Sequence, residues 1–372
     1  MKAQFTKESL AHALQKVRGA VDEQTPLPIL TNLLLEARDG KSRLTGTNLD
    51  LRITVALNSA VADKADVAIP AKTLGDLVSR LADPEASLVL SGDIQKGQIH
   101  VTAVGKQKFS GSIPVLSKDD FPKAAKLEGE VKLSVSAKEL LGGLKRTVVA
   151  AAVEDSRRYL TGVLFDLEGA DLKLVSTDSH RLAFVRIGVD GKFQKREFLV
   201  PIRSCQELIR CLPDDDSSVS LTFTERVALF SMDGLTLQTQ LIAEKFPNYA
   251  QVIPKEFETN FLVDVTELTQ ALRLVSVFTD VQNPRVLFKL EPNSLKISAA
   301  SQDRGSGDAT LGLKYSGSPM ELAFNVNYCL DAISQIETPE VQVRVITPKN
   351  PCVFRTPDDN SHLHVIMPMR IA

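Results

Sequence analysis

The chain repeats one pattern three times, and this repeat constrains its fold more than any other feature. Phe165-Asp166-Leu167-Glu168 precedes Asp171-Leu172-Lys173-Leu174, and Phe288-Lys289-Leu290-Glu291 precedes Ser294-Leu295-Lys296-Ile297, shifted by 123 positions (Phe288 against Phe165). Leu35 to Leu44 is a third copy, 130 positions before the second (Leu35 against Phe165). A period this long corresponds to a whole folding unit rather than a solenoid repeat. The function is therefore expected to belong to an assembly of equal domains.

Each repeat is predicted to be an α+β domain with two helices and about eight antiparallel strands. Apolar residues recur at spacings of three and four in the helical segments and alternate in the strands, as in Ser218–Phe223. The first helix of each repeat follows Thr6, Ser136 and Val265, and the second spans Lys72–Leu81, Arg203–Leu212 and Asn327–Ile336.

Two Phe-Pro corners mark the ends of equivalent repeats. They are Phe121-Pro122 and Phe246-Pro247, 125 positions apart (Phe246 against Phe121). The predicted domains span residues 1–125, 130–250 and 256–372. Neither joint is a long Gly/Ser linker, so the domains are expected to be docked rather than tethered.

Composition limits the class of protein. A chain of 372 residues is too long for one core and suits three domains. The net charge of -2 carries no bulk signature of nucleic-acid binding, so such contacts must come from local clustering. The four cysteines form no C-x-x-C pair, and no apolar leader or membrane-length stretch occurs. These features predict a reduced, soluble, cytoplasmic protein.

Thr177-Asp178-Ser179-His180-Arg181-Leu182 combines a carboxylate, a hydroxyl and an imidazole. Residues this close in a strand or turn do not fold back into a hydrolase relay, whose members come from separate segments. The chain contains no nucleophile elbow, phosphate loop, dinucleotide motif or zinc-protease motif. The segment is therefore predicted to be a partner-binding surface turn. A structural histidine is the first alternative, and catalysis is the last.

Three other features leave alternatives open. His362 and His364 are expected on one strand face, but without a third ligand the sequence predicts an exposed face, no metal and no cofactor. Met367-Pro368-Met369-Arg370 could line a groove for apolar peptides or pack in the core. Basic residues on the helices could form one positive surface or ordinary solvated faces.

Six segments, together with the triple repeat, make the chain resemble a known family along nearly its whole length. They are Pro26-Leu27-Pro28-Ile29-Leu30 with Leu33-Leu34-Leu35, Tyr159-Leu160-Thr161-Gly162, Thr177–Leu182, Phe246-Pro247-Asn248-Tyr249, Phe324-Asn325-Val326-Asn327-Tyr328 and Met367-Pro368-Met369-Arg370. On these segments the chain resembles the bacterial sliding clamps, the β subunits of DNA polymerase III.

The resemblance implies a head-to-tail homodimer that closes a ring of six like domains around duplex DNA, without sequence preference. Such a clamp has no catalysis of its own. It is a processivity factor in DNA replication that tethers the DNA polymerase III core, the clamp loader and other proteins carrying a clamp-binding peptide. Partners would dock between the second and third domains. By motif, the implied pocket consists of Leu160, Thr177, Ser179, His180, Arg181, Leu182, Pro247, Val252, Tyr328, Pro351, Val365, Ile366, Met367, Pro368, Met369 and Arg370.

The resemblance also implies a DNA-binding set and a dimer interface. The implied DNA-binding residues are Gln24, Lys138, Arg146, Arg157, Arg158, Tyr159, Arg203 and Arg210. At the interface, Leu77, Lys106, Lys108 and Phe109 of one chain would face Leu272, Val275, Asp303 and Asp308 of the other.

Three residues depart from the family pattern. Ser179 stands where the family often has Gly, and Gln251 stands where Arg is common, so the pocket rim is expected to be less basic. Gln24 replaces an Arg that contacts DNA in some members, and Arg157 and Arg158 are expected to compensate. Two rival classes are a hydrolase centred on His180 and a repeat scaffold that binds proteins but not DNA. Retention on circular DNA that disappears after linearisation separates the clamp from both.

Overall fold

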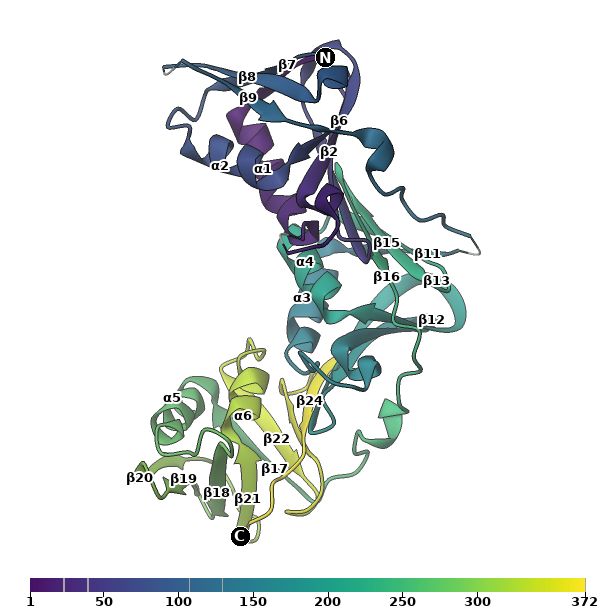
Figure 1. The fold of residues 1–372 in the computed structure, drawn as a ribbon. Coiled ribbons are helices and arrows are strands. Elements are labelled where there is room, and N and C mark those ends of the chain that lie inside the picture. The colour runs from purple at the N-terminus through teal and green to yellow at the C-terminus, as the bar shows by residue number, and fades with distance from the viewer. Residues whose placement is uncertain (23, 39, 107, 129, 372) are drawn as a thin grey trace. The chain divides into compact units, whose positions relative to one another are not determined.

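The computed structural model describes residues 1–22, 24–38, 40–106, 108–128 and 130–371 (Figure 1). It divides into two compact units. The first unit consists of Met1–Ala137 with Glu207–Leu241, and the second consists of Lys138–Gln206 with Ile242–Ala372. No helix in the described part of the chain is long and apolar enough to cross a membrane.

The first unit contains two antiparallel sheets. One has the order β5-β1-β7-β8-β9, with β1 (Lys2–Thr6), β5 (Ala60–Asp63), β7 (Ser87–Ser91), β8 (Gln98–Val104) and β9 (Phe109–Pro114). The other has the order β10-β6-β2-β3-β4-β16-β15-β14-β11, with β2 (Asn32–Ala37), β3 (Ser42–Thr47), β4 (Leu51–Leu57), β6 (Ala65–Pro70), β10 (Leu116–Ser117), β11 (Val131–Ser136), β14 (Ser218–Phe223), β15 (Val227–Met232) and β16 (Leu235–Gln240). Because β16 pairs with β4, placing Leu237 opposite Ile53, the sheet of the first repeat continues into the second.

The helices of the first repeat are α1 (Lys7–Val17) and α2 (Ala71–Arg80). Thr6 caps α1, since its side chain accepts a hydrogen bond from Ser9 N at 3.2 Å. The apolar stripe of α1 buries Leu10 and Val17, and that of α2 buries Leu74 and Val78. Both helices therefore pack by one face, as the spacing predicts.

The second unit also contains two antiparallel sheets. One has the order β12-β13-β24-β23-β22-β17, with β12 (Gly162–Thr177), β13 (Arg181–Pro201), β17 (Thr259–Asp264), β22 (Glu340–Val345), β23 (Cys352–Arg355) and β24 (His362–Ile366). The other has the order β20-β19-β18-β21, with β18 (Arg285–Glu291), β19 (Ser294–Ser301), β20 (Gly305–Gly312) and β21 (Met320–Asn325). The C-terminal strand β24 pairs with β13, placing Val365 opposite Leu182, and so joins the second and third repeats.

The remaining helices are α3 (Ala137–Val148), α4 (Ile202–Cys211), α5 (Val265–Ser276) and α6 (Val326–Ile333). Short 3₁₀ turns lie at η1 (Arg18–Ala20), η2 (Pro28–Thr31), η3 (Ile94–Lys96), η4 (Lys118–Asp120), η5 (Arg158–Thr161) and η6 (Tyr249–Gln251). The predicted α+β class with two helices in each repeat is confirmed. The second repeat has fewer strands than the others because β12 and β13 are 16 and 21 residues long, each replacing two shorter strands.

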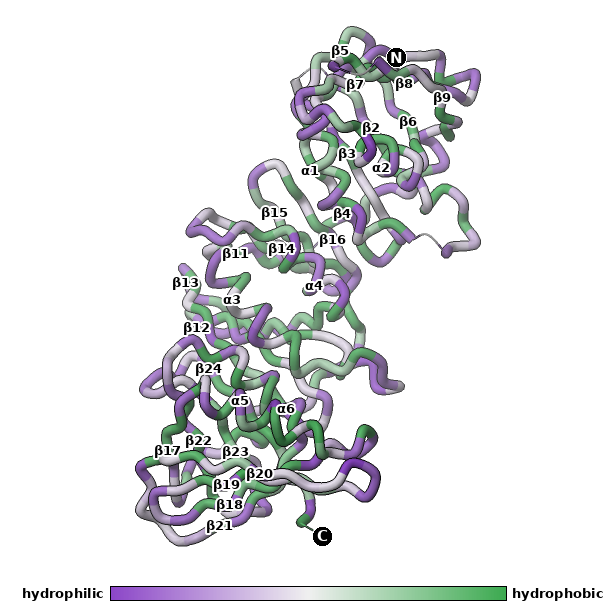
Figure 2. The backbone as a smooth tube through the Cα atoms, turned by 90° about the vertical axis from the view of Figure 1, so that its left-hand side faces the viewer, coloured by the Kyte–Doolittle hydropathy of each residue, from purple (hydrophilic) through white to green (hydrophobic). Residues whose placement is uncertain are grey.

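The strands carry the core. Figure 2 shows hydrophobic stretches along the strands and helices and hydrophilic stretches in several loops. In the third repeat, the Phe288 and Phe354 rings each pack edge-on against Phe324, with centroids 5.2 and 5.8 Å away. The two units do not follow the predicted domain bounds, because β16 and β24 each pair with a strand of another repeat. Those bounds stay a prediction, and residue 372 lies outside the described residues.

Candidate functional site

A cavity of about 630 Å³ opens in the second unit. Four separate segments build it: the η5 region, the β12–β13 turn, the connector after Phe246, and the strands and loops of the third repeat. The residues that line it are Arg157, Tyr159, Leu160, Thr177, Ser179, Arg181, Leu182, Pro247, Asn248, Tyr249, Gln251, Val252, Pro254, Ile346, Asn350, Pro351, Val365 and Met367. The walls are largely apolar, with amides and hydroxyls among them.

Local hydrogen bonds fix the β12–β13 turn. The Thr177 hydroxyl donates to Arg181 O at 2.6 Å and accepts from Ser179 N at 3.1 Å. The Asp178 carboxylate accepts from the backbone N–H of His180 at 2.9 Å and of Arg181 at 3.0 Å. These are the bonds of a side-chain-stabilised turn, not of a hydrolase relay. Ser179 adopts a left-handed φ of 77°, a conformation that glycine accepts with less strain.

The same turn occurs in the first repeat. There the Thr47 hydroxyl donates to Leu51 O at 2.9 Å and accepts from Leu49 N at 3.2 Å, while Leu51 N donates to Asn48 at 2.8 Å. Leu49 has a φ of 79°, close to that of Ser179. The threonine and the Asp or Asn after it therefore stabilise a turn that both repeats share. The residues specific to the cavity are those that come after them in the second repeat.

Arg181 ties the turn to the third repeat. Its Nε donates to Asp178 Oδ2 at 3.0 Å, and its Nη1 donates to Asp331 on α6. Its guanidinium lies over the Tyr328 ring, 4.3 Å from the centroid. Tyr328, predicted in the pocket, therefore lies against Arg181 and is not among the lining residues. Burial, followed by the Asp178 carboxylate, raises the pKa of the Tyr328 hydroxyl.

The C-terminal segment reaches the cavity with one methionine. Met367 N donates to His180 O at 2.9 Å, and the Met367 side chain lines the cavity. Ile366 points the other way into the core of the third repeat, because successive side chains of a strand face opposite sides. Met369 N donates to Ala323 O at 2.7 Å, which leads the tail away along β21.

The cavity brings together ten of the sixteen residues predicted for the pocket: Leu160, Thr177, Ser179, Arg181, Leu182, Pro247, Val252, Pro351, Val365 and Met367. The six others lie outside its lining: His180, Tyr328, Ile366, Pro368, Met369 and Arg370. The prediction missed Asn248, Tyr249, Gln251, Pro254, Ile346 and Asn350, and assigned Arg157 and Tyr159 to DNA instead. The Phe-Pro-Asn-Tyr motif could have supplied Asn248 and Tyr249.

The charge of the cavity is one-sided. Arg157 and Arg181 are its charged lining residues, and no carboxylate belongs to the described lining. Arg157 donates from Nε and Nη2 to both oxygens of Asp155, at 3.0 and 2.8 Å, and these bonds lower the pKa of Asp155 to about 2. Because this described lining pairs no nucleophile with a base, the arrangement suits binding rather than bond breaking.

Several residues predicted to bind DNA have protein partners. Arg146 pairs with Glu337 at 2.9 Å, and Arg210 pairs with Glu207 at 2.9 Å. Arg210 also donates to Gln15 O at 3.2 Å. By contrast, Lys138, Arg158 and Arg203 are exposed, and no ion pair involves them in the part of the chain that the structure describes; Gln24 is exposed as well.

Two predicted interface residues are wrong. Leu272 and Val275 are 0% and 1% exposed and pack in the core of the third repeat, so they offer no surface to a second chain. The opposite face of α5 exposes Leu274, with Val277 just beyond its end. Phe109, Lys106 and Lys108 are exposed at and before the edge strand β9, and Leu77 is half-buried. Asp303 and Asp308 are exposed around β20, where Asp308 pairs with Lys296 at 3.2 Å.

The expected exposed histidine face is also wrong. His362 and His364 are 1% and 3% exposed, with ring centroids 4.9 Å apart. Burial, followed by the charge of Arg146, lowers the pKa of His362 to about 4. Among the described residues no group of three or more His, Cys, Asp or Glu side chains could hold a metal ion.

Comparisons with known proteins agree along the whole chain. Family models described as the N-terminal, central and C-terminal domains of the DNA polymerase III beta subunit match residues 1–125, 134–248 and 250–370. The chain is 27% identical to the beta sliding clamp of Vibrio cholerae and 30% identical to that of Synechococcus elongatus, with full coverage of both chains. A structure of the Pseudomonas aeruginosa clamp bound to griselimycin aligns with a TM-score of 0.94 at 26% identity over all of both chains.

Proposed function

Because this chain belongs to the DNA polymerase III beta subunit family, we propose that it is a sliding clamp whose partners dock a short apolar peptide in the 630 Å³ cavity. The family's subunit is a non-catalytic processivity factor. It keeps a polymerase on DNA by encircling the duplex, so that release requires the ring to open. The cytoplasm is its proposed location, because the DNA that it would encircle lies there.

One observation carries the proposal for the cavity. Its walls combine apolar side chains with side-chain amides and the flexible Met367, which is 37% exposed. Apolar walls with a few fixed polar groups suit a short peptide, because anchors bury apolar area while polar groups set the orientation. Two buried anchors at about 1.5–3 kcal/mol each contribute about 3–6 kcal/mol, the larger part of the roughly 8 kcal/mol that a micromolar affinity requires.

Two chains are proposed to close the ring through the first repeat of one and the third repeat of the other. The support is an edge strand on each side, because β9 and β20 end their sheets and present unpaired backbone groups. Basic Lys106 and Lys108, just before β9, complement acidic Asp303, just before β20, and Asp308 within it. Phe109 and Leu274, 39% and 67% exposed, replace Leu272 and Val275 as the proposed apolar contacts.

DNA contact is proposed to be weak and spread over several cations, with Lys138, Arg158 and Arg203 preferred because they are exposed. Removing the cation that binds one phosphate should lower the slope of log affinity against log salt by about 0.9. Strong contacts would resist sliding, so a protein of net charge -2 is compatible with this role.

The test is a titration of a labelled peptide from the catalytic subunit of DNA polymerase III. Val252 and Met367 line the cavity, and changing both to Asp should weaken binding at least about tenfold, because charge would enter an apolar wall. A matched change of Val104 to Asp, on an exposed strand of the first unit, should leave the affinity unchanged. Equal affinity of all three proteins would remove the cavity from the proposal.

A further inference from the structure

The connector between the second and third repeats forms one whole wall of the cavity. Of the eighteen residues that line the cavity, the connector supplies six: Pro247, Asn248, Tyr249, Gln251, Val252 and Pro254. Its backbone bonds include local ones within η6, such as Val252 N to Tyr249 O at 3.0 Å. A wall made of a short turn needs an attachment to a sheet if the cavity is to keep its shape.

Tyr249 supplies that attachment. Its hydroxyl donates to Asp166 Oδ2 on β12 at 2.6 Å. Its ring packs near Phe184 of β13, with centroids 6.2 Å apart, and lies against an apolar cluster that includes Phe246 and Val365. The tyrosine therefore lines the cavity with one side while its hydroxyl reaches a strand behind it.

Among the described residues, Tyr249 is the one that donates a hydrogen bond to the Asp166 side chain. Asp166 is 1% exposed, does not line the cavity, and its second oxygen has no hydrogen-bond partner among the described residues. The nearby Lys195 pairs with Glu197 at 3.1 Å. A buried carboxylate with so few donors depends strongly on the one it has. Burial, followed by the bond to Asp166, raises the pKa of the Tyr249 hydroxyl, so it keeps its proton and stays a donor.

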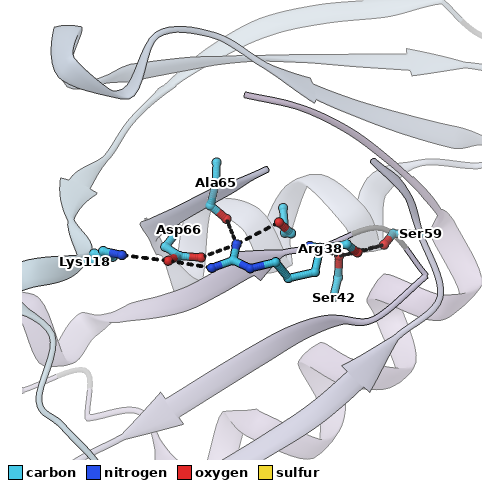
Figure 3. Close-up of polar contacts among 7 residues, drawn as sticks. Arg38, Ser42, Ser59, Ala65, Asp66 and Lys118 are labelled. Atoms are coloured by element: carbon cyan, nitrogen blue, oxygen red, sulfur yellow. Dashed lines mark hydrogen bonds and ion pairs between the residues drawn. The ribbon is translucent and has the colours of Figure 1, made fainter. Parts of the chain in front are cut away.

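The first repeat also fastens its exit segment at this register of its sheet, an attachment here called a latch, but through the carboxylate of the opposite strand. Glu36 lies opposite Asp66 there, just as Asp166 lies opposite Glu197 in the second repeat. Figure 3 shows Asp66 between Arg38 and Lys118. Its carboxylate oxygens lie 2.6 Å from Arg38 Nη1 and 2.8 Å from Lys118 Nζ. Lys118 belongs to η4, at the end of the first repeat, so both repeats fasten their exit segment to this carboxylate pair.

The third repeat carries a different pair at this register. Lys289 lies opposite Glu321 at the same register, and its ammonium pairs with Glu291 at 2.9 Å. Two carboxylates thus face each other at this register in the first and second repeats, whereas a lysine faces a glutamate in the third.

We propose that Asp166 is a positioning residue for peptide binding: through the Tyr249 hydroxyl it holds the connector as a preformed wall of the cavity. The part of this inference that concerns peptide binding rests on the proposed function, and the part that concerns the Asp166–Tyr249 attachment rests on the geometry. Its test therefore has one readout for each.

The first readout is peptide affinity in the full-length protein, with the labelled polymerase peptide as probe. Tyr249→Phe and Asp166→Ala should each raise Kd about tenfold, and the double variant should lose little more, because both remove one bond. Asp166→Asn keeps an acceptor and should stay within about threefold of wild type. Lys118→Met breaks the equivalent contact in the first repeat and should leave Kd unchanged.

The second readout is hydrogen exchange without peptide. The amides of Gln251 and Val252 should exchange faster in Tyr249→Phe and Asp166→Ala than in wild type and Asp166→Asn. Unchanged exchange would overturn the latch, and faster exchange with unchanged Kd would overturn its positioning role. If wild type bound no peptide while exchange still rose, the proposed function would fail and the latch would stand.

Discussion

Asp66 in the first repeat and Asp166 in the second hold the segments that leave their repeats, but with different chemistry. Asp66 is held by two cations, Arg38 and Lys118, whose side chains are 41% and 52% exposed. Asp166 is 1% exposed and is held by the neutral hydroxyl of Tyr249. Exposed ion pairs are screened by water and salt, whereas a buried hydrogen bond depends on geometry. The two repeats use opposite members of equivalent carboxylate pairs, so the same pair of positions can hold an exposed joint or one wall of a binding cavity.

The largest expected difference between the two units is in how their stability responds to acid. The pKa of His362 in the second unit is lowered from 6.5 to about 4, so the unfolded chain binds more protons in that range and stability falls as the pH drops from 6.5 to 4. The full shift corresponds to about 3 kcal/mol. In the first unit, burial raises the pKa of Asp66, but the hydrogen bonds from Arg38 and Lys118 together outweigh burial and lower it, so its latch should weaken only below the ordinary value of 3.8.

Urea unfolding between pH 7 and 4 measures this effect. His362→Phe should reduce the slope of the free energy of unfolding against pH, because it removes the titrating ring and keeps much of its volume. His100→Phe, on an exposed residue of the first unit, should leave the slope as in wild type. Equal slopes for wild type and His362→Phe would contradict the assignment.

Removing one donor from each latch should produce unequal losses of stability. Tyr249→Phe strands a buried carboxylate and should cost about 1–3 kcal/mol. Lys118→Met leaves Asp66 paired with Arg38 and should cost less than about 1 kcal/mol. The free energies of unfolding of the two variants give the comparison directly, and a larger loss for Lys118→Met would break it.

Salt should weaken the Lys118–Asp66 contact and leave the Tyr249–Asp166 hydrogen bond unchanged. At about 1 M NaCl the Debye length is roughly 3 Å, so the exposed contact of Lys118 with Asp66 should weaken by up to about 1 kcal/mol. Amide exchange around η4 should then accelerate, while exchange around η6 stays constant. Faster exchange around η6 alone would show that the second latch, not the first, is electrostatic.

The smallest expected effect compares the two equivalent turns. Leu49 and Ser179 have φ values of 79° and 77°, so replacing either by Gly should relieve strain. The gain should be about 0.5–1 kcal/mol at Leu49 and smaller at Ser179, after the entropy cost of glycine in the unfolded chain. Thermal unfolding of both variants checks the order, and a loss at both positions would mean that the side chains stabilise their turns.

The repeat and the helices were predictable because periodic burial leaves a periodic sequence. Observed α2 and α4, Ala71–Arg80 and Ile202–Cys211, each lie one residue before the predicted spans. The long strands β12 and β13 were not predictable as such, because alternation continues through positions that looked like turns. Successive side chains of a strand face opposite sides, so Val365 lies in the cavity and Ile366 in the core. A prediction that assigns a whole motif to the pocket misses this difference.

Residues whose role depends on a distant partner were the hardest to assign. Arg146 and Arg210 have the spacing of cations on a helix surface, yet they form ion pairs with Glu337 and Glu207. Leu272 and Val275 are apolar and helical, which fits an interface and a core equally well. Asp166 was visible only as part of the repeat, because nothing in the sequence indicates that Tyr249 lies beside it.

Retention on DNA tests the central claim of a sliding clamp most directly. The protein is loaded onto nicked circular DNA by its clamp loader, separated from free protein at moderate salt, and measured again after the circle is cut once. A ring that holds DNA by topology should stay on the circle and leave the linear molecule through its ends. Equal retention on circular and linear DNA, or none on either, would contradict the account.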